Sequence, residues 1–185
     1  MQATDALMHE HRLIERVSRA LVAFADGQRR NAGDDRAELK RFVTFIGRFS
    51  DGTHHRKEED ILFAEMVEGG FSRDGGPVAV MLREHDEVRS YGAVLVDLAG
   101  RERPWSAADR DRLAQAASAY VELLLEHIQK EDGILYPVAD AHLPAESKAR
   151  VDSRCARFDA ESSAETQSLR ILGEELAARH GGAQR

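Results

Sequence analysis

The sequence predicts an all-α protein, an up-and-down four-helix bundle followed by an additional C-terminal helix. Apolar residues recur every three or four positions over most of the chain, which is the period of helices with one buried face. The chain has only 4 prolines, and its paired glycines fall between the periodic stretches, so long segments are free of helix breakers. Alternating apolar patterns and Asn-Gly turns, the signals of strands and hairpins, are missing from the sequence.

The first two predicted helices cover residues 5–26 and 34–68. The first is expected to begin at Asp5 as its N-cap. The second is expected to bend at Gly52 and to end at the glycine pair 69–70. The predicted buried faces comprise Leu7, Leu13, Ile14, Val17, Leu21 and Phe24 in the first helix, and Phe42, Phe45, Ile46, Phe49, Ile61, Leu62 and Met66 in the second.

The remaining predicted helices cover residues 77–98, 106–136 and 144–180. Pro77 is a favourable first-turn residue for the third helix. Ser106 begins the fourth, where Ser-Ala-Ala-Asp resembles a capping box, and Pro137 is expected to end it. The fifth helix is more polar, so we expect it to pack alongside the bundle or to project toward a partner.

The composition argues against several classes of protein. Lys and Arg number 26 against 33 Asp and Glu, a formal charge of −7, whereas nucleic-acid-binding proteins show a clustered basic excess. No apolar run approaches the ~18 residues of a membrane span, and 42% hydrophobic residues indicate a soluble folded protein. The N-terminus lacks a secretory pattern and Cys155 is the single cysteine, so a cytoplasmic location is expected. The 185 residues suit one bundle domain, residues 1–140, with a helical extension, residues 141–185.

Two segments share one histidine-containing pattern. The ten residues that start at His54 and the ten that start at His127 both read H-x-x-K-E-[ED]-x-I-L-[FY], which selects Glu58 and Glu131 as the partners of these histidines. A separation of four residues places both side chains on one helix face, so an imidazole and a carboxylate can converge on one cation or on adjacent cations. Two copies, on the second and fourth helices, predict a metal site rather than two solvated pairs.

A second repeat relates the first and third helices. Glu10-His11 aligns with Glu84-His85, and each histidine lies among the apolar positions of its helix. A buried histidine needs a polar partner, which a metal ion would supply. The four helices together then aim four imidazoles and two carboxylates at the bundle axis, enough to hold two metal ions with a bridging oxygen or water. Mixed nitrogen and oxygen donors without thiolate suit iron, manganese or zinc.

These motifs resemble those of the hemerythrin-like, or HHE cation-binding, family over residues 5–140. That family has Glu-His on the first and third helices and H-x-x-x-E before apolar residues on the second and fourth. The stretch 76–87 is also similar to di-iron proteins implicated in repair of nitrosylated or oxidised iron–sulfur centres. The resemblance implies a hemerythrin-like bundle around a non-haem di-iron centre with an oxo or hydroxo bridge, which oxygen, nitric oxide or peroxide reaches. By position, the implied ligands are His11, His54, Glu58, His85, His127 and Glu131.

One position departs from the oxygen-carrying hemerythrins. They have a fifth histidine four residues after the third-helix histidine, where this chain has Arg89. The departure argues against reversible oxygen carriage, and it leaves one metal position open or free for Tyr120 or His55. Without such a role, His55 and His9 are interpreted as flanking residues and Tyr120 as core. The charged residues beside the motifs are interpreted as a solvated face: Arg56, Lys57, Glu59, Asp60, Lys130 and Asp132.

The sequence favours a non-haem di-iron protein that binds or transforms a small oxidant, namely oxygen, peroxide or nitric oxide. Peroxide dismutation and nitric oxide reduction fit best as reactions, because both use two metals and need no large substrate cleft. A mostly dry pocket is expected around the metals, lined by Phe45, Phe49, Leu62, Leu124 and Leu135. The alternative is an iron or oxygen sensor or carrier, whose polar segment 145–179 passes a change to a protein partner or to a second copy of the chain.

Overall fold

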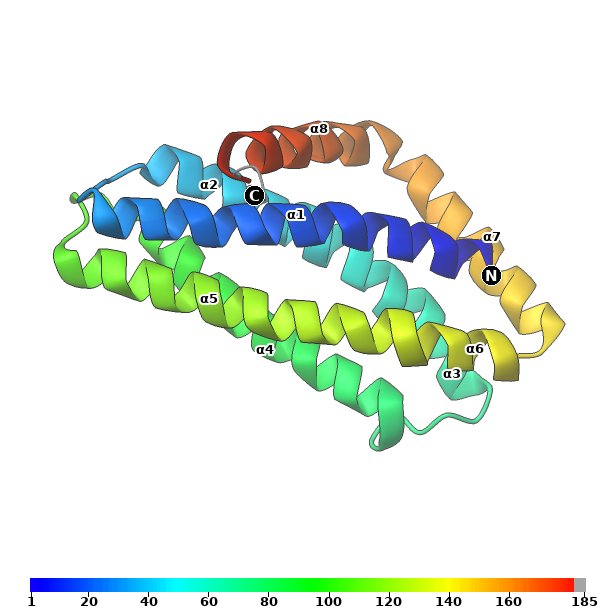
Figure 1. The fold of residues 1–185 in the computed structure, drawn as a ribbon. Coiled ribbons are helices and arrows are strands. Elements are labelled where there is room, and N and C mark those ends of the chain that lie inside the picture. The colour runs from blue at the N-terminus through cyan, green and yellow to red at the C-terminus, as the bar shows by residue number, and fades with distance from the viewer. Residues whose placement is uncertain (182–185) are drawn as a thin grey trace.

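The computed structural model describes residues 1–181, whose long helices run side by side, with two further helices along one side (Figure 1). In chain order the elements are α1 (Gln2–Arg30), α2 (Arg36–Phe45), the π-helical segments η1 (Ile46–His55) and η2 (Glu58–Leu62), α3 (Phe63–Glu68), α4 (Gly76–Ala99), α5 (Ala107–Lys130), the π-helical η3 (Glu131–Leu135), α6 (Tyr136–His142), α7 (Ala145–Glu161) and α8 (Ser163–His180). Residues 1–181 contain no strand, and the predicted all-α class is confirmed.

Four rods make the bundle. The first is α1, the second is the continuous run of α2, η1, η2 and α3, the third is α4, and the fourth is α5 with η3 and α6. α1 packs against α5, α5 against α4, and α4 against α2, while α8 lies along α1 and α2 (Figure 1). The predicted up-and-down bundle is therefore confirmed. The single predicted C-terminal helix is instead two helices, because the backbone leaves helical geometry at Ser162 (φ −105°, ψ 9°).

The N-terminus of α1 is held by the C-terminal part of the chain. The helix begins at Gln2 and not at Asp5, so the predicted N-cap is wrong. The amide of Ala3 donates to Oδ1 of Asp152 in α7 at 2.8 Å. An N-terminal amide that a distant side chain satisfies needs no local cap, which is why the sequence around Asp5 misplaces the start.

The second rod starts with a conventional cap and then changes its helical type. The side chain of Asp35 accepts a hydrogen bond from the Glu38 amide, as expected at an N-cap. Gly52, where the sequence predicts a bend, lies inside η1, and His54 and His55 end that segment, both buried. π-helical turns are rare and occur frequently at functional sites. Because a π turn holds more residues than an α turn, adjacent side chains diverge less, and both histidines face the bundle interior.

The fourth rod starts where the sequence predicts but extends beyond its predicted end. The predicted capping box is present: the Ser106 side chain accepts from the Asp109 amide, and the Asp109 side chain accepts from the Ser106 amide. Pro137 does not end the helix, because it lies in the first turn of α6, directly after η3. A proline is tolerated in a first helical turn, where its missing N–H has no helical partner. The rod therefore continues to His142.

Two hydrophobic clusters fill the interior. One includes Phe45, Phe49 and Leu124, and the other includes Leu62 and Leu135, so all five residues predicted to line a dry pocket are buried. Along the sequence of each rod, the histidines and glutamates of the repeats lie between residues that belong to one cluster and residues that belong to the other. A polar layer thus separates two apolar regions.

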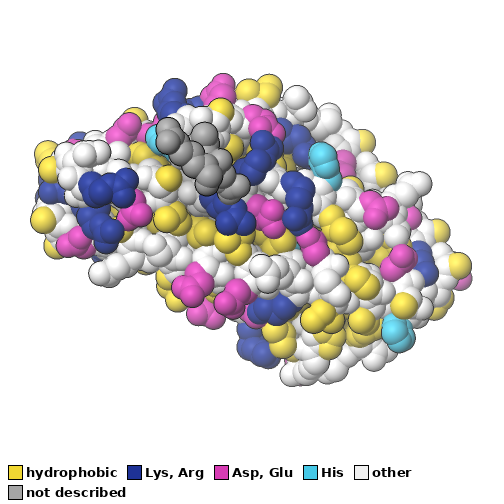
Figure 2. Space-filling model, viewed as in Figure 1, with side chains coloured by type: hydrophobic (Ala, Val, Ile, Leu, Met, Phe, Trp, Pro, Cys, Tyr) yellow, Lys and Arg dark blue, Asp and Glu magenta, His cyan; other side chains and the backbone are white. Residues whose placement is uncertain are grey.

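Ion pairs fasten α8 to the bundle on the face shown in Figure 2, where acidic and basic side chains are interspersed with apolar ones. Arg16 of α1 pairs with Glu174 at 2.5 Å, and Glu38 of α2 accepts from His180 at 2.8 Å. The prediction that the C-terminal segment packs alongside the bundle is therefore confirmed. Within the described part of the chain, no helix combines the length and apolarity needed to cross a membrane.

Candidate metal centre

Buried side chains from all four rods meet in the polar layer between the two hydrophobic clusters. They form two groups of candidate ligands. Group A comprises His11, His54, Glu58 and Glu131, and group B comprises His55, Glu58, His85 and His127. Within each group, one nitrogen or oxygen atom of every side chain lies within 4.8 Å of those of the others. No member is more than 2% exposed. Because Glu58 belongs to both groups, the two groups are adjacent and share a carboxylate.

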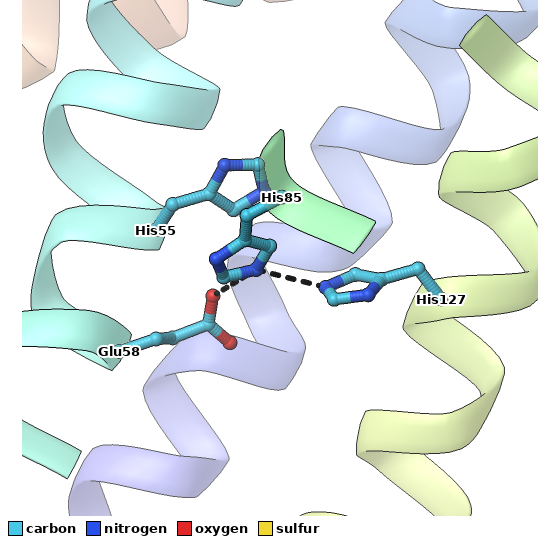
Figure 3. A group of neighbouring side chains, drawn as sticks. All are labelled: His55, Glu58, His85 and His127. Carbon is cyan, nitrogen blue, oxygen red and sulfur yellow. Dashed lines mark hydrogen bonds and ion pairs between the residues drawn. The ribbon is translucent and has the colours of Figure 1, made fainter. Parts of the chain in front are cut away.

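Glu58 faces both groups. Its Oε1 lies 3.6 Å from Nε2 of His54 in group A, and its Oε2 lies 3.4 Å from Nε2 of His85 in group B. Figure 3 shows group B, in which the rings of His55 and His85 stack with their centroids 3.9 Å apart. Nε2 of His85 also lies 3.0 Å from Nε2 of His127 (Figure 3). Donor atoms from three rods therefore converge on one small volume.

Glu131 faces both groups in the same way. Its Oε2 lies 3.3 Å from Nε2 of His11 in group A, and its Oε1 lies 3.2 Å from Nε2 of His127 in group B. Each carboxylate can therefore bridge two cations, one in each group.

Tyr136 donates its hydroxyl proton to Glu58 and stacks on the His11 ring. The sequence alone does not reveal this role, because Tyr136 ends the apolar part of the repeat and is typical of core.

Acidic residues orient the imidazole rings from behind. The Nδ1-to-oxygen distances are 2.7 Å for His11 and Asp132, 3.0 Å for His54 and Glu10, 2.6 Å for His85 and Glu59, 2.9 Å for His127 and Glu84, and 3.4 Å for His55 and Asp51. A charged carboxylate only accepts hydrogen bonds, so each Nδ1 carries a proton and Nε2 is the ring nitrogen that faces the centre. Metal-ligating histidines typically make this outer hydrogen bond.

The acid partners follow the two sequence repeats. Glu10 on the first rod contacts His54 on the second, just as Glu84 on the third rod contacts His127 on the fourth. Asp132 on the fourth rod likewise contacts His11 on the first, just as Glu59 on the second rod contacts His85 on the third. The two halves of the bundle are therefore internally symmetric around the centre.

The electrostatics of the centre fit a cation. Within residues 1–181, Oε2 of Glu58 and both carboxylate oxygens of Glu131 have no hydrogen-bond partner, although both residues are fully buried. Burial and the charge of Glu131 raise the pKa of Glu58 well above its usual value. Burial also raises the pKa of Glu131, but His127 and His11 outweigh it and hold that pKa well below its usual value. Cations between the two carboxylates would remove their repulsion and satisfy the unpaired oxygens.

The imidazoles of the second rod are in the form that binds metals. Burial, followed by the charge of His11, lowers the pKa of His54 to about 3. Burial is also the main reason why the pKa of His55 lies below its usual value. Both rings are therefore neutral near pH 7, and a neutral imidazole is the ligating species.

The family model for the hemerythrin HHE cation binding domain matches residues 2–139. The chain belongs to this family. Uncharacterised proteins of Mycobacterium tuberculosis and Mycobacterium bovis are 29% identical to it over 142 residues, which are 73% of this chain and 52% of each relative. The iron–sulfur cluster repair protein YtfE of Escherichia coli O81 is 32% identical over 94 residues, 47% of this chain and 40% of that protein. The chain thus spans about half the length of the curated relatives it matches, and no solved structure matches it.

The HHE domain brings together all six residues that the sequence predicts as metal ligands. They are His11, His54, Glu58, His85, His127 and Glu131. The chain is thus a cation-binding protein whose family match coincides with a buried layer of histidine and glutamate side chains. Ligation by each of the six residues stays a prediction.

His55 lies in group B, which agrees with the alternative that it fills the open metal position rather than with its interpretation as a flanking residue, and ligation by His55 stays a prediction. It brings a fifth imidazole to the centre, whereas Arg89, at the position of the fifth histidine in oxygen carriers, donates to Glu59 at 2.6 Å. The repeat hides His55, because the matching residue of the other copy is an isoleucine. His9 is exposed and Tyr120 lies in the core, outside both groups, as the sequence predicts.

Part of the predicted solvated face is buried. Lys57 is 1% exposed and donates to Glu10 at 2.7 Å and to Asp159 of α7 at 2.9 Å. Glu59 and Asp132 contact Nδ1 of His85 and of His11, two of the candidate ligands. The interpretation fails for these residues because α7 covers Lys57 and because each acid reaches a histidine on another rod. Their signal in the sequence is their recurrence in both copies of the repeat.

Proposed function

We propose that this HHE domain holds two iron ions, one in each group of candidate ligands, and binds or transforms a small oxidant. The observation that carries the proposal is the convergence of five imidazoles on two buried carboxylates, each of which faces both groups. Nitrogen and oxygen donors without thiolate suit iron, with manganese and zinc as the other metals of this donor set. Similarity to a protein named for iron–sulfur cluster repair supports iron. The oxidant is oxygen, peroxide or nitric oxide.

Bound in groups A and B, two iron ions would supply the redox chemistry that such an oxidant needs. The residues of the chain hold the site in shape, because five acids fix the imidazole rings and two hydrophobic clusters exclude water on either side. The Tyr136 hydroxyl keeps a proton at Oε1 of Glu58, beside the ligand His11. Peroxide dismutation and nitric oxide reduction are the reactions this layout favours, because both use two metals and no large cleft.

Metal analysis of protein purified from iron-supplemented cells tests the proposal. We expect one iron for each group, a near-ultraviolet band of bridged ferric iron, and repeated loss of added peroxide or nitric oxide. His54→Ala and Glu58→Ala should each lower the iron content. His142→Ala should not, because His142 is exposed and its Nδ1 contacts only the Val138 carbonyl at 3.0 Å. A single zinc per chain, or equal iron loss in all three variants, contradicts the proposal.

A second candidate function, an iron or oxygen sensor or carrier, is favoured by one contact network. Glu10, which orients His54, also accepts from Lys57 at 2.7 Å and from Arg170 of α8 at 3.0 Å. Lys57 in turn donates to Asp159 of α7 at 2.9 Å. A change at His54 can therefore reach both C-terminal helices through ion pairs, and from them a protein partner or a second copy.

Hydrogen exchange of α7 and α8, with and without iron, separates the two candidates. A sensor changes the protection of these helices on iron binding and consumes little oxidant, whereas a catalyst consumes oxidant with unchanged protection. Arg170→Gln should weaken the coupling by cutting the link to Glu10. Arg48→Gln is the control, because it breaks another ion pair of α8, with Glu165 at 2.7 Å, that does not touch the network.

A further inference from the structure

A cavity of about 300 Å³ lies between the second rod and α4. Its apolar walls come from Val43, Ile46, Val88 and Val96. Gly92 of α4 and Gly47 of η1 also line it. A Cβ at Gly92 would meet only Ile46, at 3.9 Å, and a Cβ at Gly47 would meet nothing within 4 Å. The two glycines therefore leave open space on both sides of the cavity.

One part of the cavity is polar and borders the candidate metal centre. His55, a member of group B, lines it together with Ser50 and Tyr120. Ser50 and Tyr120 are each 1% exposed, and within residues 1–181 neither hydroxyl has a hydrogen-bond partner. Burial raises the pKa of Tyr120 above its usual value, so this hydroxyl keeps its proton and can donate. Asp51 and Arg89, paired at 2.7 Å and partly exposed, border the cavity on its solvent side.

The cavity is larger than oxygen, nitric oxide or hydrogen peroxide needs. Its 300 Å³ corresponds to roughly ten water molecules at ~30 Å³ each, and it is about twice the ~150 Å³ apolar cavity that binds benzene in another protein. Oxygen, nitric oxide and hydrogen peroxide would each fill only a small part of this volume. An apolar space with two unpaired buried hydroxyls suits a ligand with an apolar body and one oxygen-bearing end, because an unpaired buried hydroxyl is costly.

We propose that this cavity binds a small organic molecule with an apolar body and a single hydroxyl or hydroperoxyl end, with that end at the hydroxyls of Ser50 and Tyr120, beside the ring of His55. The apolar body lies between the valines of α2 and α4 and the two glycines. The choice of hydroperoxyl compounds within this class rests on the proposed oxidant function. The choice of an apolar body of this size rests on the cavity alone.

Benzyl alcohol and toluene are the probes, because they match in size and differ in the hydroxyl group. Ligand-observed NMR titration of the protein with its bound metal measures the dissociation constant of each probe. We expect benzyl alcohol to bind more tightly than toluene. Tyr120→Phe should reduce this preference by roughly threefold to tenfold, the ratio that one lost hydrogen bond gives. An unchanged preference in Tyr120→Phe overturns the assigned orientation.

Gly92→Leu tests the location, because its side chain fills the space that Gly92 leaves open. The dissociation constant of benzyl alcohol should rise by roughly tenfold or more, as expected for an overfilled site. Gly27→Leu is the matched control, since a Cβ there meets nothing within 4 Å and neither Gly27 nor any other residue of α1 lines the cavity. If Gly92→Leu does not fold, Gly47→Leu fills the cavity from the opposite wall. Wild-type affinity in a folded cavity-filling variant, or no binding by the wild type, overturns the proposal.

The binding measurement is independent of the metal chemistry. Suppose the protein holds no iron and consumes no oxidant, but binds benzyl alcohol more weakly after Gly92→Leu. The proposed function is then wrong, and the proposed organic site stands. Suppose instead that the protein holds two irons and consumes peroxide, but Gly92→Leu leaves its affinity for benzyl alcohol unchanged. The organic site is then wrong, and the proposed function stands.

Discussion

Nδ1 of His54 lies 3.0 Å from Oε2 of Glu10, so the acid that orients one candidate ligand directly precedes another, His11, in the chain. The Glu-His dipeptide thus serves two rods, with its histidine facing the centre and its glutamate holding a ring of the second rod. Burial raises the pKa of Glu10, but the hydrogen bonds and charges of His54 and Lys57 outweigh it and lower that pKa to about 2. Glu10 is therefore a charged acceptor at neutral pH.

Glu10→Gln should weaken metal binding by roughly 10- to 100-fold, the usual cost of removing the acid behind a ligating histidine. The change keeps the size of the side chain and removes its charge, so the loss reports on the orientation and basicity of His54. Equilibrium dialysis against a buffered metal solution measures the affinity. Glu122→Gln, at an exposed position of α5, should leave it unchanged. Equal affinities of Glu10→Gln and wild type would show that Glu10 has no role at the metal.

His55→Ala should remove metal from group B and spare group A, because His55 belongs only to group B. The expected result is a fall from two metal ions per chain toward one, measured by elemental analysis after dialysis. His9→Ala is the control, since His9 is exposed and lies outside both groups. A metal content that stays at the wild-type value in His55→Ala contradicts the fifth-imidazole assignment.

The residues that the sequence predicts correctly are those whose evidence is local or repeated. The periodic apolar stripes mark the four rods, and the capping box at Ser106 marks the start of α5. The six predicted ligands meet because the two repeats are symmetric, and equivalent positions on symmetric rods face one axis. Neither inference needs knowledge of which rods are neighbours.

The features that the sequence does not predict depend on contacts between distant segments or on helix type. His55 faces the centre because η1 is π-helical, and the period of an α-helix gives no sign of that change. Lys57 is buried because α7 covers it, and Asp5 is not a cap because Asp152 satisfies the amide of Ala3. These outcomes follow from how α7 folds back on the bundle, which the helical period cannot predict.

Lys57→Met should destabilise the protein far more than Lys130→Met, although the two lysines are equivalent in the repeat. Lys57 is 1% exposed, and removing it takes the buried cation away from Glu10, which keeps only His54 and the partly exposed Arg170, a loss of about 3 to 5 kcal/mol in the free energy of unfolding. The side chain of Lys130 is 35% exposed, and its pair with Glu84 should contribute less than about 1 kcal/mol. Urea unfolding at fixed metal content measures both. Similar losses in the two variants would contradict the buried network.

Gly173→Ala and Gly27→Ala should change stability in opposite directions. At Gly173 in α8, a Cβ would lie 2.5 Å from Phe45 and 3.2 Å from Leu13, and both of those side chains are buried in the core. Alanine there should cost about 1 to 3 kcal/mol, because the packed core cannot take the extra group. At Gly27 a Cβ meets nothing, so alanine should stabilise α1 by up to about 1 kcal/mol through its helix propensity.

Arg170, one turn before Gly173 on α8, donates to Glu10 at 3.0 Å. Gly173→Ala should therefore lift α8 and increase its cleavage in limited proteolysis, while the bundle keeps its helical circular dichroism. If the C-terminal helices carry a signal from the metal centre, this variant should also abolish the iron-dependent change in their hydrogen exchange. Stabilisation by Gly173→Ala equal to that of Gly27→Ala would show that α8 does not pack this closely on the bundle in solution.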